Sequence, residues 1–289
     1  MPPASRKKKA TRKKNRHPLV EKLLGWLLLP WQWLNRLVYW LGWLSLALIL
    51  LLGSGIFFFF YTLPGVAEQS FANLQAQAEQ RVEARLEAPN AHYRWTPLRR
   101  VNRDLLYAVV MAEDARFFEH RGLDYDALLD AFITNLRRGE TAFGGSTLSQ
   151  QTVKNLFLTP QQSYYRKLRE AVITRRLEAN FSKNEILELY LNVAEFGPDI
   201  YGVDAASRYY FGKPPAAINA AEGAYLALML PSPRRYHYSL FQNRNLTSGL
   251  QRKYQRILRG MRLANYISRD QYNYYLPLIQ RNDWPQRRP

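Results

Sequence analysis

Four patches of the sequence combine residue types that could carry chemistry, and the first contains clustered carboxylates. Glu113 and Asp114 precede the aromatic pair Phe117-Phe118, and His120 follows that pair. A carboxylate packed against aromatic rings is desolvated, which raises its pKa towards the range useful for general acid–base catalysis. The alternative interpretation is a Glu-Asp pair at a solvated helix end, the commoner setting for such a pair.

The second patch is the run 144–155, in which two glycines and several hydroxyl residues precede a predicted helix. A helix that begins in this way offers free backbone amides to a phosphate group. Gln150 and Lys154 are four residues apart, as are Gln151 and Asn155, so each pair can share a helix face. The spacing is neither that of a P-loop nor that of a GxSxG nucleophile elbow. Taken alone, the run is more typical of a polar helix surface.

The third and fourth patches have simple structural interpretations. Arg166 and Glu170, with Lys167 between them, have the spacing of a helical salt bridge, which is usually a weak surface interaction. The run 201–213 joins a glycine turn to an aromatic-rich helix, and most of it is expected to serve packing.

An uncharged segment precedes all four patches. Residues 37–63 are almost wholly apolar, and no charged residue occurs from 37 to 67. A bilayer core of about 30 Å requires roughly 20 apolar residues in a helix, so this segment is long enough to span it. It exceeds the apolar core of a signal peptide, which predicts a retained anchor. The preceding residues 23–34 are expected to lie along the membrane interface, and a buried core helix is the alternative interpretation of the whole segment.

The distribution of charge predicts the orientation of this span. Residues 6–16 contain eight Lys or Arg and no acid, whereas Glu68 begins the opposite flank. The positive-inside rule therefore places the N-terminus in the cytoplasm and the rest of the chain outside it. Binding of nucleic acid by the basic tail is the weaker alternative, since such a tail also contacts anionic lipid.

Periodicity predicts a mainly α fold beyond the membrane. Residues 66–87 have the pattern of an amphipathic helix, interpreted as a stalk. Ser182 and Glu185 form a capping box ahead of a further helix, and helical spacing recurs at 105–112, 217–230 and 249–266. Alternating strand patterns are scarce. The predicted organisation is a basic tail with an interfacial segment (1–36), a membrane span (37–63), a helical stalk (64–94) and a folded domain (95–289).

Composition excludes several classes of site. The chain of 289 residues has no Cys, which excludes disulfides, thiolate metal sites and a cysteine nucleophile. Its 4 His are scattered and form no clustered metal pattern. The formal net charge of +18 is concentrated in the first 36 residues, but the remainder is also basic. An anionic partner is therefore expected.

Together the patches resemble the motifs of glycosyltransferase family 51, the peptidoglycan glycosyltransferases. The resemblance runs through Glu113-Asp114 to Gly122, through 144–155, and through Arg166-Lys167 with Glu170. It continues through 185–192, 202–213 and 230–233. It covers residues 95–236, with a weaker echo at 259–276, and it implies a lysozyme-like, α-helical fold.

The resemblance also implies a reaction. Such enzymes polymerise lipid II into β-1,4-linked glycan strands, with inversion at the sugar and release of undecaprenyl pyrophosphate. Glu113 would be the base that activates the acceptor hydroxyl. Lys154 would face the departing pyrophosphate, supported by Arg166 and Lys167. Glu170 would either position the acceptor or assist departure of the leaving group.

Further implications concern the groove, cofactors and location. The residues implied to line the groove are Ser146, Gln150, Gln151 and Asn155. No cofactor is required by the sequence, although a divalent cation, Mg²⁺ or Mn²⁺, could bridge the substrate phosphates. Gln162 stands where many members carry an Arg that contacts phosphate. The implied location is a bacterial inner membrane, crossed once, with the catalytic domain on the periplasmic side.

The expected partners are lipid II, the lipid-linked glycan chain and the membrane, with other cell-wall synthesis or division proteins as candidates and no nucleic acid. The transpeptidase motifs of bifunctional relatives are missing. The one Ser-x-x-Lys lies in the tail and no Lys-Thr-Gly occurs, which predicts a monofunctional enzyme.

Two rival functions stay open at this stage. A lysozyme-like enzyme that cleaves peptidoglycan also uses one Glu beside a sugar groove, but it has no pyrophosphate to hold and no use for the polar run 144–155. A non-catalytic scaffold for cell-wall proteins is the other rival, which a polymerisation assay would distinguish.

Overall fold

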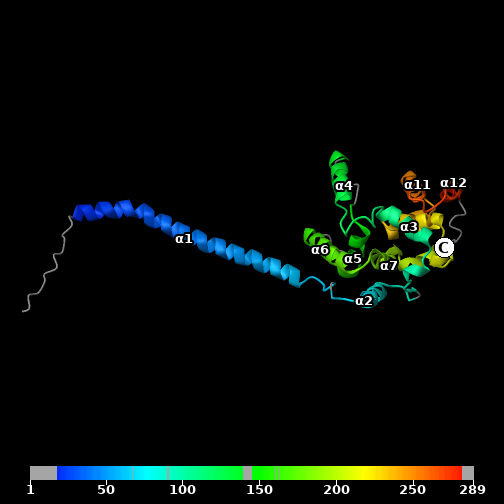
Figure 1. The fold of residues 1–289 in the computed structure, drawn as a ribbon, viewed down its shortest axis with the longest axis horizontal. Coiled ribbons are helices and arrows are strands. Elements are labelled where there is room, and N and C mark those ends of the chain that lie inside the picture. The colour runs from blue at the N-terminus through cyan, green and yellow to red at the C-terminus, as the bar shows by residue number, and fades with distance from the viewer. Residues whose placement is uncertain are drawn as a thin grey trace, which may run out of the picture. The chain divides into compact units, whose positions relative to one another are not determined.

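The computed structural model describes residues 18–66, 68–89, 91–138, 145–159, 161 and 163–281, and it divides into two units (Figure 1). One unit contains the helix α1, and the other begins at Pro64. Most of the predicted basic tail lies outside the described residues, as do Gly144 and Gln162.

The first unit is a single long helix, α1 (Pro18–Tyr61), with Pro30 inside it. Its segment Trp33–Tyr61 has 29 residues, a mean hydropathy of 2.3 and no buried residue. At about 1.5 Å per residue this segment is longer than the ~30 Å of a bilayer core. Residues 23–34, which are expected to lie at the membrane interface, belong to the same unbroken helix as this apolar segment. α1 therefore has the length and composition of a membrane anchor.

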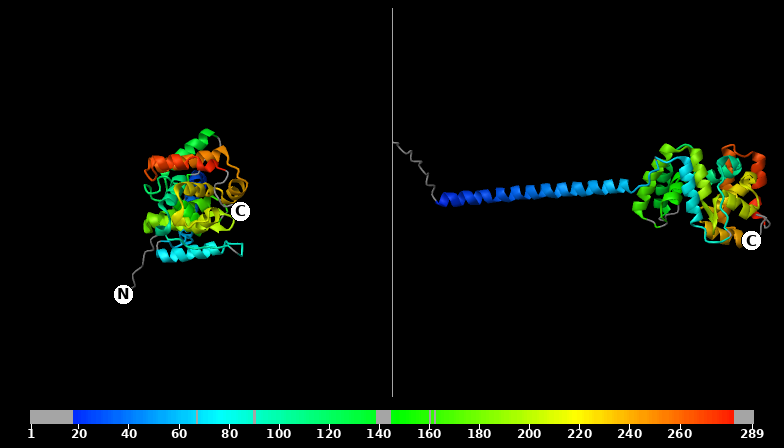
Figure 2. Two further views of the ribbon diagram at one scale, coloured as in Figure 1. Left: turned by 90° about the vertical axis from the view of Figure 1, so that its right-hand side faces the viewer. Right: turned by 90° about the horizontal axis from the view of Figure 1, so that it is seen from below.

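The helix predicted as a stalk is α2 (Phe71–Glu83), which is shorter than the pattern suggested. Its apolar stripe, Leu74, Ala78 and Val82, is buried, and it packs against α7 (Lys183–Val193) and α5 (Leu148–Phe157). In Figure 2 this helix, in cyan, lies along one side of the second unit. The expectation of a separate stalk is therefore corrected, because an apolar stripe at this spacing needs a packing partner and finds one in the domain.

The second unit is mainly α-helical, as predicted. Its other longer helices are α3 (Arg103–Glu113), α4 (Tyr125–Arg138), α6 (Tyr164–Asn180), α8 (Gly202–Phe211), α9 (Ala220–Met229) and α11 (Ser248–Leu263). Its shorter elements are α10 (Pro233–Tyr236), α12 (Arg269–Tyr275), the π-helical turn η3 (His237–Gln242) and the 3₁₀ turns η1 (Leu98–Arg100), η2 (Pro215–Ala217) and η4 (Leu278–Gln280). The strands of the described residues, β1 (Glu195–Gly197) and β2 (Ile200–Tyr201), form one antiparallel pair.

The core of this unit is built around α9, all of whose residues are buried. α9 packs against α3 and α11. At the crossing with α3, a Cβ on Gly223 would lie 2.8 Å from Leu105 Cα, so only glycine permits this approach. The close approach fixes the position of α3 on α9, and Glu113 is the last residue of α3.

A second cluster of helices is formed by α5, α6 and α7, with α5 packed against both of the others. Capping boxes start α5 at Thr147 and α7 at Ser182, the second of which was predicted from the sequence. These caps satisfy the free amides of the first turn. They fix the residues at which α5 and α7 begin.

Candidate active site

Glu113 ends α3 with a carboxylate that is only 10% exposed. Gln151 Nε2 donates to its Oε2 at 3.1 Å, and Lys253 Nζ, from α11, lies 3.1 Å from its Oε1. Of the aromatic pair that follows it in the sequence, Phe117 is buried under the Lys183 ammonium, and Phe118 is 45% exposed. The Glu113 carboxylate is thus bound by an amide and an ammonium.

Glu170 lies on α6 with a side chain that is 4% exposed. Lys167 donates to its Oε1, Arg166 Nη1 lies 3.3 Å from its Oε2, and Gln150 Nε2 donates to Oε1 at 3.2 Å. Two cations and an amide therefore surround this buried carboxylate. The predicted salt bridge between Arg166 and Glu170 is present, but it joins a half-buried guanidinium to a buried carboxylate rather than two surface groups.

Two adjacent glutamines of α5 connect the two carboxylates. Gln151 contacts Glu113 and also accepts from the Tyr190 hydroxyl at 3.4 Å, whereas Gln150 contacts Glu170. Gln150 is 2% exposed and forms the capping box with Thr147. It therefore lies inside the protein, where it orients Glu170, rather than on an open groove surface.

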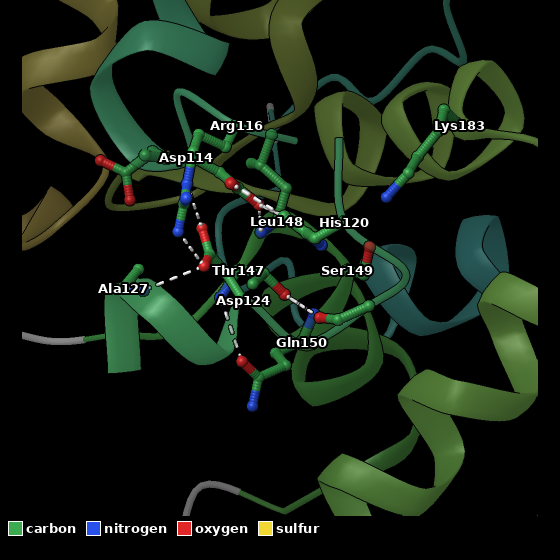
Figure 3. A network of polar contacts seen from close by, with 12 residues as sticks. Asp114, Arg116, His120, Asp124, Ala127, Thr147, Leu148, Ser149, Gln150 and Lys183 are labelled. Atoms are coloured by element: carbon green, nitrogen blue, oxygen red, sulfur yellow. Dashed lines mark hydrogen bonds and ion pairs between the residues drawn. The ribbon is translucent and has the colours of Figure 1, made fainter. Parts of the chain in front are cut away.

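The N-terminus of α5 is held by the buried Asp114 (Figure 3). Asp114 Oδ2 accepts from the Leu148 amide at 3.0 Å, and His120 Nε2 lies 3.0 Å from both carboxylate oxygens. A carboxylate at a helix N-terminus complements the helix dipole. The contact ties the first turn of α5 directly to the residue that follows Glu113.

A second set of contacts fixes the loop between α3 and α4 (Figure 3). Arg116 binds Asp124 through Nε, at 3.0 Å, and through Nη2, and it reaches Asp126 at 2.9 Å. Asp124 also accepts from the Ala127 amide at 2.9 Å, and these contacts lower its pKa against the opposing effect of burial. Thr147 donates to the Gly122 carbonyl, so this loop is joined to the start of α5.

Three cations, Lys154, Arg166 and Lys167, lie beside the two carboxylates. Besides its contact with Glu170, Lys167 donates to Ser146 at 3.0 Å. Lys154 is exposed as a whole residue, yet desolvation of its ammonium lowers its pKa. Glu170 and Glu113 oppose that shift, while Arg166 and Lys167 add to it. An ammonium that is partly stripped of water interacts strongly with phosphate.

An open pocket of about 690 Å³ adjoins these cations, lined in part by Lys154, Asn155 and Arg166. The structure thus places every predicted site residue on α3, α5, α6 or the loop that leads into α5. Of these residues, Lys154, Asn155 and Arg166 line the pocket, whereas Glu113, Gln151, Glu170, Lys167 and Ser146 are linked by the hydrogen bonds described above.

Among the described residues, one trio has the composition of a metal site: Asp114, His120 and Asp124. Asp114 is already bound to an amide and to His120, and Asp124 is bound to the Arg116 guanidinium. A guanidinium on one ligand opposes a second cation. The trio therefore fits the polar network of Figure 3 better than a metal site.

Sequence reasoning missed Lys253 and Tyr190. Lys253 stands in a strongly amphipathic helix whose basic residues resemble an ordinary solvated face. Tyr190 resembles a core aromatic, and it is indeed buried. Burial, with a further contribution from Glu113, raises the pKa of Tyr190 well above its usual value, so its hydroxyl stays protonated and donates to Gln151.

A mainly helical domain with Glu113 at a helix end, the buried Glu170 and a cationic pocket fits an enzyme that transfers a glycosyl group from a phosphorylated donor. The sequence model of the transglycosylase family matches residues 79–269. The chain belongs to this family, and its domain is lysozyme-like.

Three relatives share the description "Biosynthetic peptidoglycan transglycosylase". The protein of Azoarcus sp. (strain BH72) is 42% identical over 213 residues, which are 72% of this chain and 88% of that protein. The protein of Pasteurella multocida (strain Pm70) is 43% identical over 203 residues, 70% and 79% of the two chains. The protein of Janthinobacterium sp. (strain Marseille) is 37% identical over 238 residues, 80% and 97% of the two chains.

Proposed function

We propose that this chain polymerises lipid II into β-1,4-linked peptidoglycan strands and releases undecaprenyl pyrophosphate. The observation that carries the proposal is the pairing of Glu113 and Glu170 with adjacent glutamines of α5, one turn before Lys154. A polymerase of this kind needs a base at one end of the reacting bond and cations at the other. The names of the relatives agree with this activity.

Glu113 acts as the base. It accepts the proton of the acceptor 4-hydroxyl as that oxygen attacks C1 of the lipid-linked sugar, and the bond from C1 to the phosphate oxygen breaks. Lys253 contacts one carboxylate oxygen of Glu113, and Gln151 holds the other. A carboxylate that is already fixed in position loses little further orientational freedom when the transition state forms.

Lys154, Arg166 and Lys167 stabilise the pyrophosphate as it gains charge. Arg166 and Lys167 are held by Glu170, which is buried and already bound to both. Glu170 therefore acts through these cations as a positioning residue on the leaving-group side. Asn155 and Ser146 line the site, and Gln150 orients Glu170 from within.

The divalent cation expected from the family resemblance would be bound by the substrate rather than by the protein. A divalent cation would arrive with the pyrophosphate, because the carboxylate of Glu170 is occupied by cations. No step of the proposed mechanism depends on it.

We place the catalytic unit on the periplasmic side of the inner membrane, with α1 as a single span. The cluster of basic residues before α1 supports a cytoplasmic N-terminus. Lipid II is itself a membrane lipid, so anchoring confines enzyme and substrate to one surface and raises their effective concentration.

The test is incubation of the detergent-purified full chain with fluorescent lipid II. The expected result is long glycan strands that lysozyme digests, together with release of undecaprenyl pyrophosphate. Shortening of preformed strands without any synthesis would instead identify a peptidoglycan-cleaving enzyme. Neither synthesis nor cleavage by the folded protein would favour the scaffold interpretation.

A further inference from the structure

The pocket beside Lys154 contains two arginines that sequence motifs did not assign. Arg85 follows α2, and Arg234 lies on α10. Both line the pocket of about 690 Å³ together with Lys154 and Arg166, while the acids of its lining are Glu87 and Glu195. Segments as far apart in sequence as Arg85 and Arg234 therefore contribute cations to one cavity, and its four cations outnumber its two acids.

Arg85 is held in place by the end of α5. Its Nη2 donates to the Asn155 carbonyl at 2.7 Å, and Arg81, one turn earlier, donates to the Leu158 carbonyl at 2.5 Å. Basic groups suit these carbonyls because the C-terminal end of a helix is its negative end. The guanidinium of Arg85 thus reaches the pocket in a defined position, next to the helix that carries Lys154.

Arg234 is held by two other residues of the pocket lining, Glu195 and Tyr201. Its Nε lies 2.8 Å from Glu195 Oε1, and it also hydrogen-bonds Tyr201. The two side chains of this ion pair are 58% and 27% exposed. Because a guanidinium has five N–H donors in a planar fork, it can bind Glu195 on one edge and an anion on the other.

We propose that Arg85 and Arg234 bind the distal phosphate of the leaving pyrophosphate, and so complete a site that begins at Lys154 and Arg166. This inference rests on the proposed function. Glu113 does not line the pocket, whereas Lys154 does. A donor whose C1 faces the base and whose first phosphate meets Lys154 therefore extends its second phosphate towards these arginines.

The chemistry explains why cations at this distance contribute to the rate. When the C1–oxygen bond breaks, its electron pair stays on the phosphate oxygen, and the proton of the acceptor passes to Glu113. The pyrophosphate gains one negative charge in this step, so cations around it stabilise the transition state more than the bound substrate. The segment that follows α2, which carries Arg85, would then be part of the substrate site.

The test uses inorganic pyrophosphate as a competitor and measures its inhibition constant on the full chain in detergent. Arg234→Gln should raise this constant about 3- to 10-fold, the modest value expected of a partly exposed charge. Glu195→Gln should lower it about 2- to 5-fold, because it removes an acid that competes with phosphate for Arg234. A merely structural ion pair would move both variants in the same direction, and that result would overturn the proposal.

Arg85 is tested in parallel. Arg85→Lys keeps the charge and should stay near the wild-type inhibition constant, whereas Arg85→Gln should raise it several-fold. Arg256→Gln, on the exposed face of α11, is the matched control and should change nothing. If thermal melts show that Arg85→Gln fails to fold, the Arg234 and Glu195 variants decide.

The failure of this proposal can be distinguished from failure of the proposed function. Titration calorimetry with pyrophosphate measures binding without any polymerisation, and it should show the same opposite shifts for the Arg234 and Glu195 variants. A wild-type enzyme that polymerises lipid II, with pyrophosphate affinity unchanged in both variants, would leave the function standing and refute the role of the arginines.

Discussion

Lys253 Nζ lies 3.1 Å from Glu113 Oε1, although 140 residues separate the two in sequence. The contact joins α11 to the end of α3, and the Lys253 side chain is 25% exposed. Lys253→Met keeps the length of the side chain and removes its charge, so it should reduce kcat about 10-fold by leaving Glu113 less well fixed. Lys253→Arg should recover most of the rate. Equal rates for the Met variant and the wild type would exclude a role for this contact.

Glu113→Gln should be the most severe of the conservative changes. The amide keeps size and hydrogen bonding but cannot accept the acceptor's proton, and loss of a general base costs about 10²- to 10⁴-fold in kcat. Binding of lipid II should survive because the phosphate site lies elsewhere. Glu119→Gln, an exposed carboxylate on the following loop, is the matched control. A folded Glu113→Gln enzyme with near wild-type kcat would require another base.

Asp114→Asn should mainly affect stability. Sequence reasoning alone would treat Asp114 as a mild neighbouring control, but the structure shows it buried, with His120 and the Leu148 amide as partners. In Asn, an NH2 group replaces one of the two oxygens that accept from His120 and the Leu148 amide. It would face an N–H group instead of accepting from it, which lowers the free energy of unfolding by about 1–3 kcal/mol. For a domain of this size that corresponds to a fall in Tm of roughly 2–12 °C. An unchanged Tm would contradict the role of Asp114 at the start of α5.

The alkaline side of the pH profile should depend on Lys154. Its pKa is lowered by desolvation, so it loses its charge at a lower pH than an ordinary lysine. Affinity for pyrophosphate should therefore be complete below that pKa and fall as the pH rises through it. In Lys154→Arg the guanidinium stays charged to pH values above about 12, so the alkaline fall in kcat/KM should disappear. A fall of the same shape in both proteins would assign the titration to another group.

The orientation of α1 can be tested with a reporter that is active only outside the cytoplasm. Fused after Pro289 it should be active, and fused at Met1 it should be silent, because the basic residues of the N-terminal segment favour the cytoplasmic side. The reverse pattern would contradict the proposed location of the active site.

Much of this protein could be predicted from its sequence because the relevant signals are local. An uncharged run, a capping box and three- and four-residue periodicity concern residues within a few turns of one another. They predicted the apolar helix, α3, α7, α9 and α11, together with the polar residues of α5 and α6. The motif resemblance then joined Glu113 and Glu170 in one site before any contact between their elements was known.

Contacts between distant elements were decided only by the tertiary structure. Lys253 and Arg234 carry no local mark, since basic residues on short or amphipathic helices usually face solvent. Their roles depend on the packing of α9 against α3 and α11 and on the position of β1, which bring them to Glu113 and Glu195. The role of Gln150 could not be predicted from the sequence either, because a glutamine at this position of a helix can line a groove or cap the helix. Only the close packing of α5 against α6 turns it inward to Glu170, since burial of its amide requires the partner that Glu170 provides.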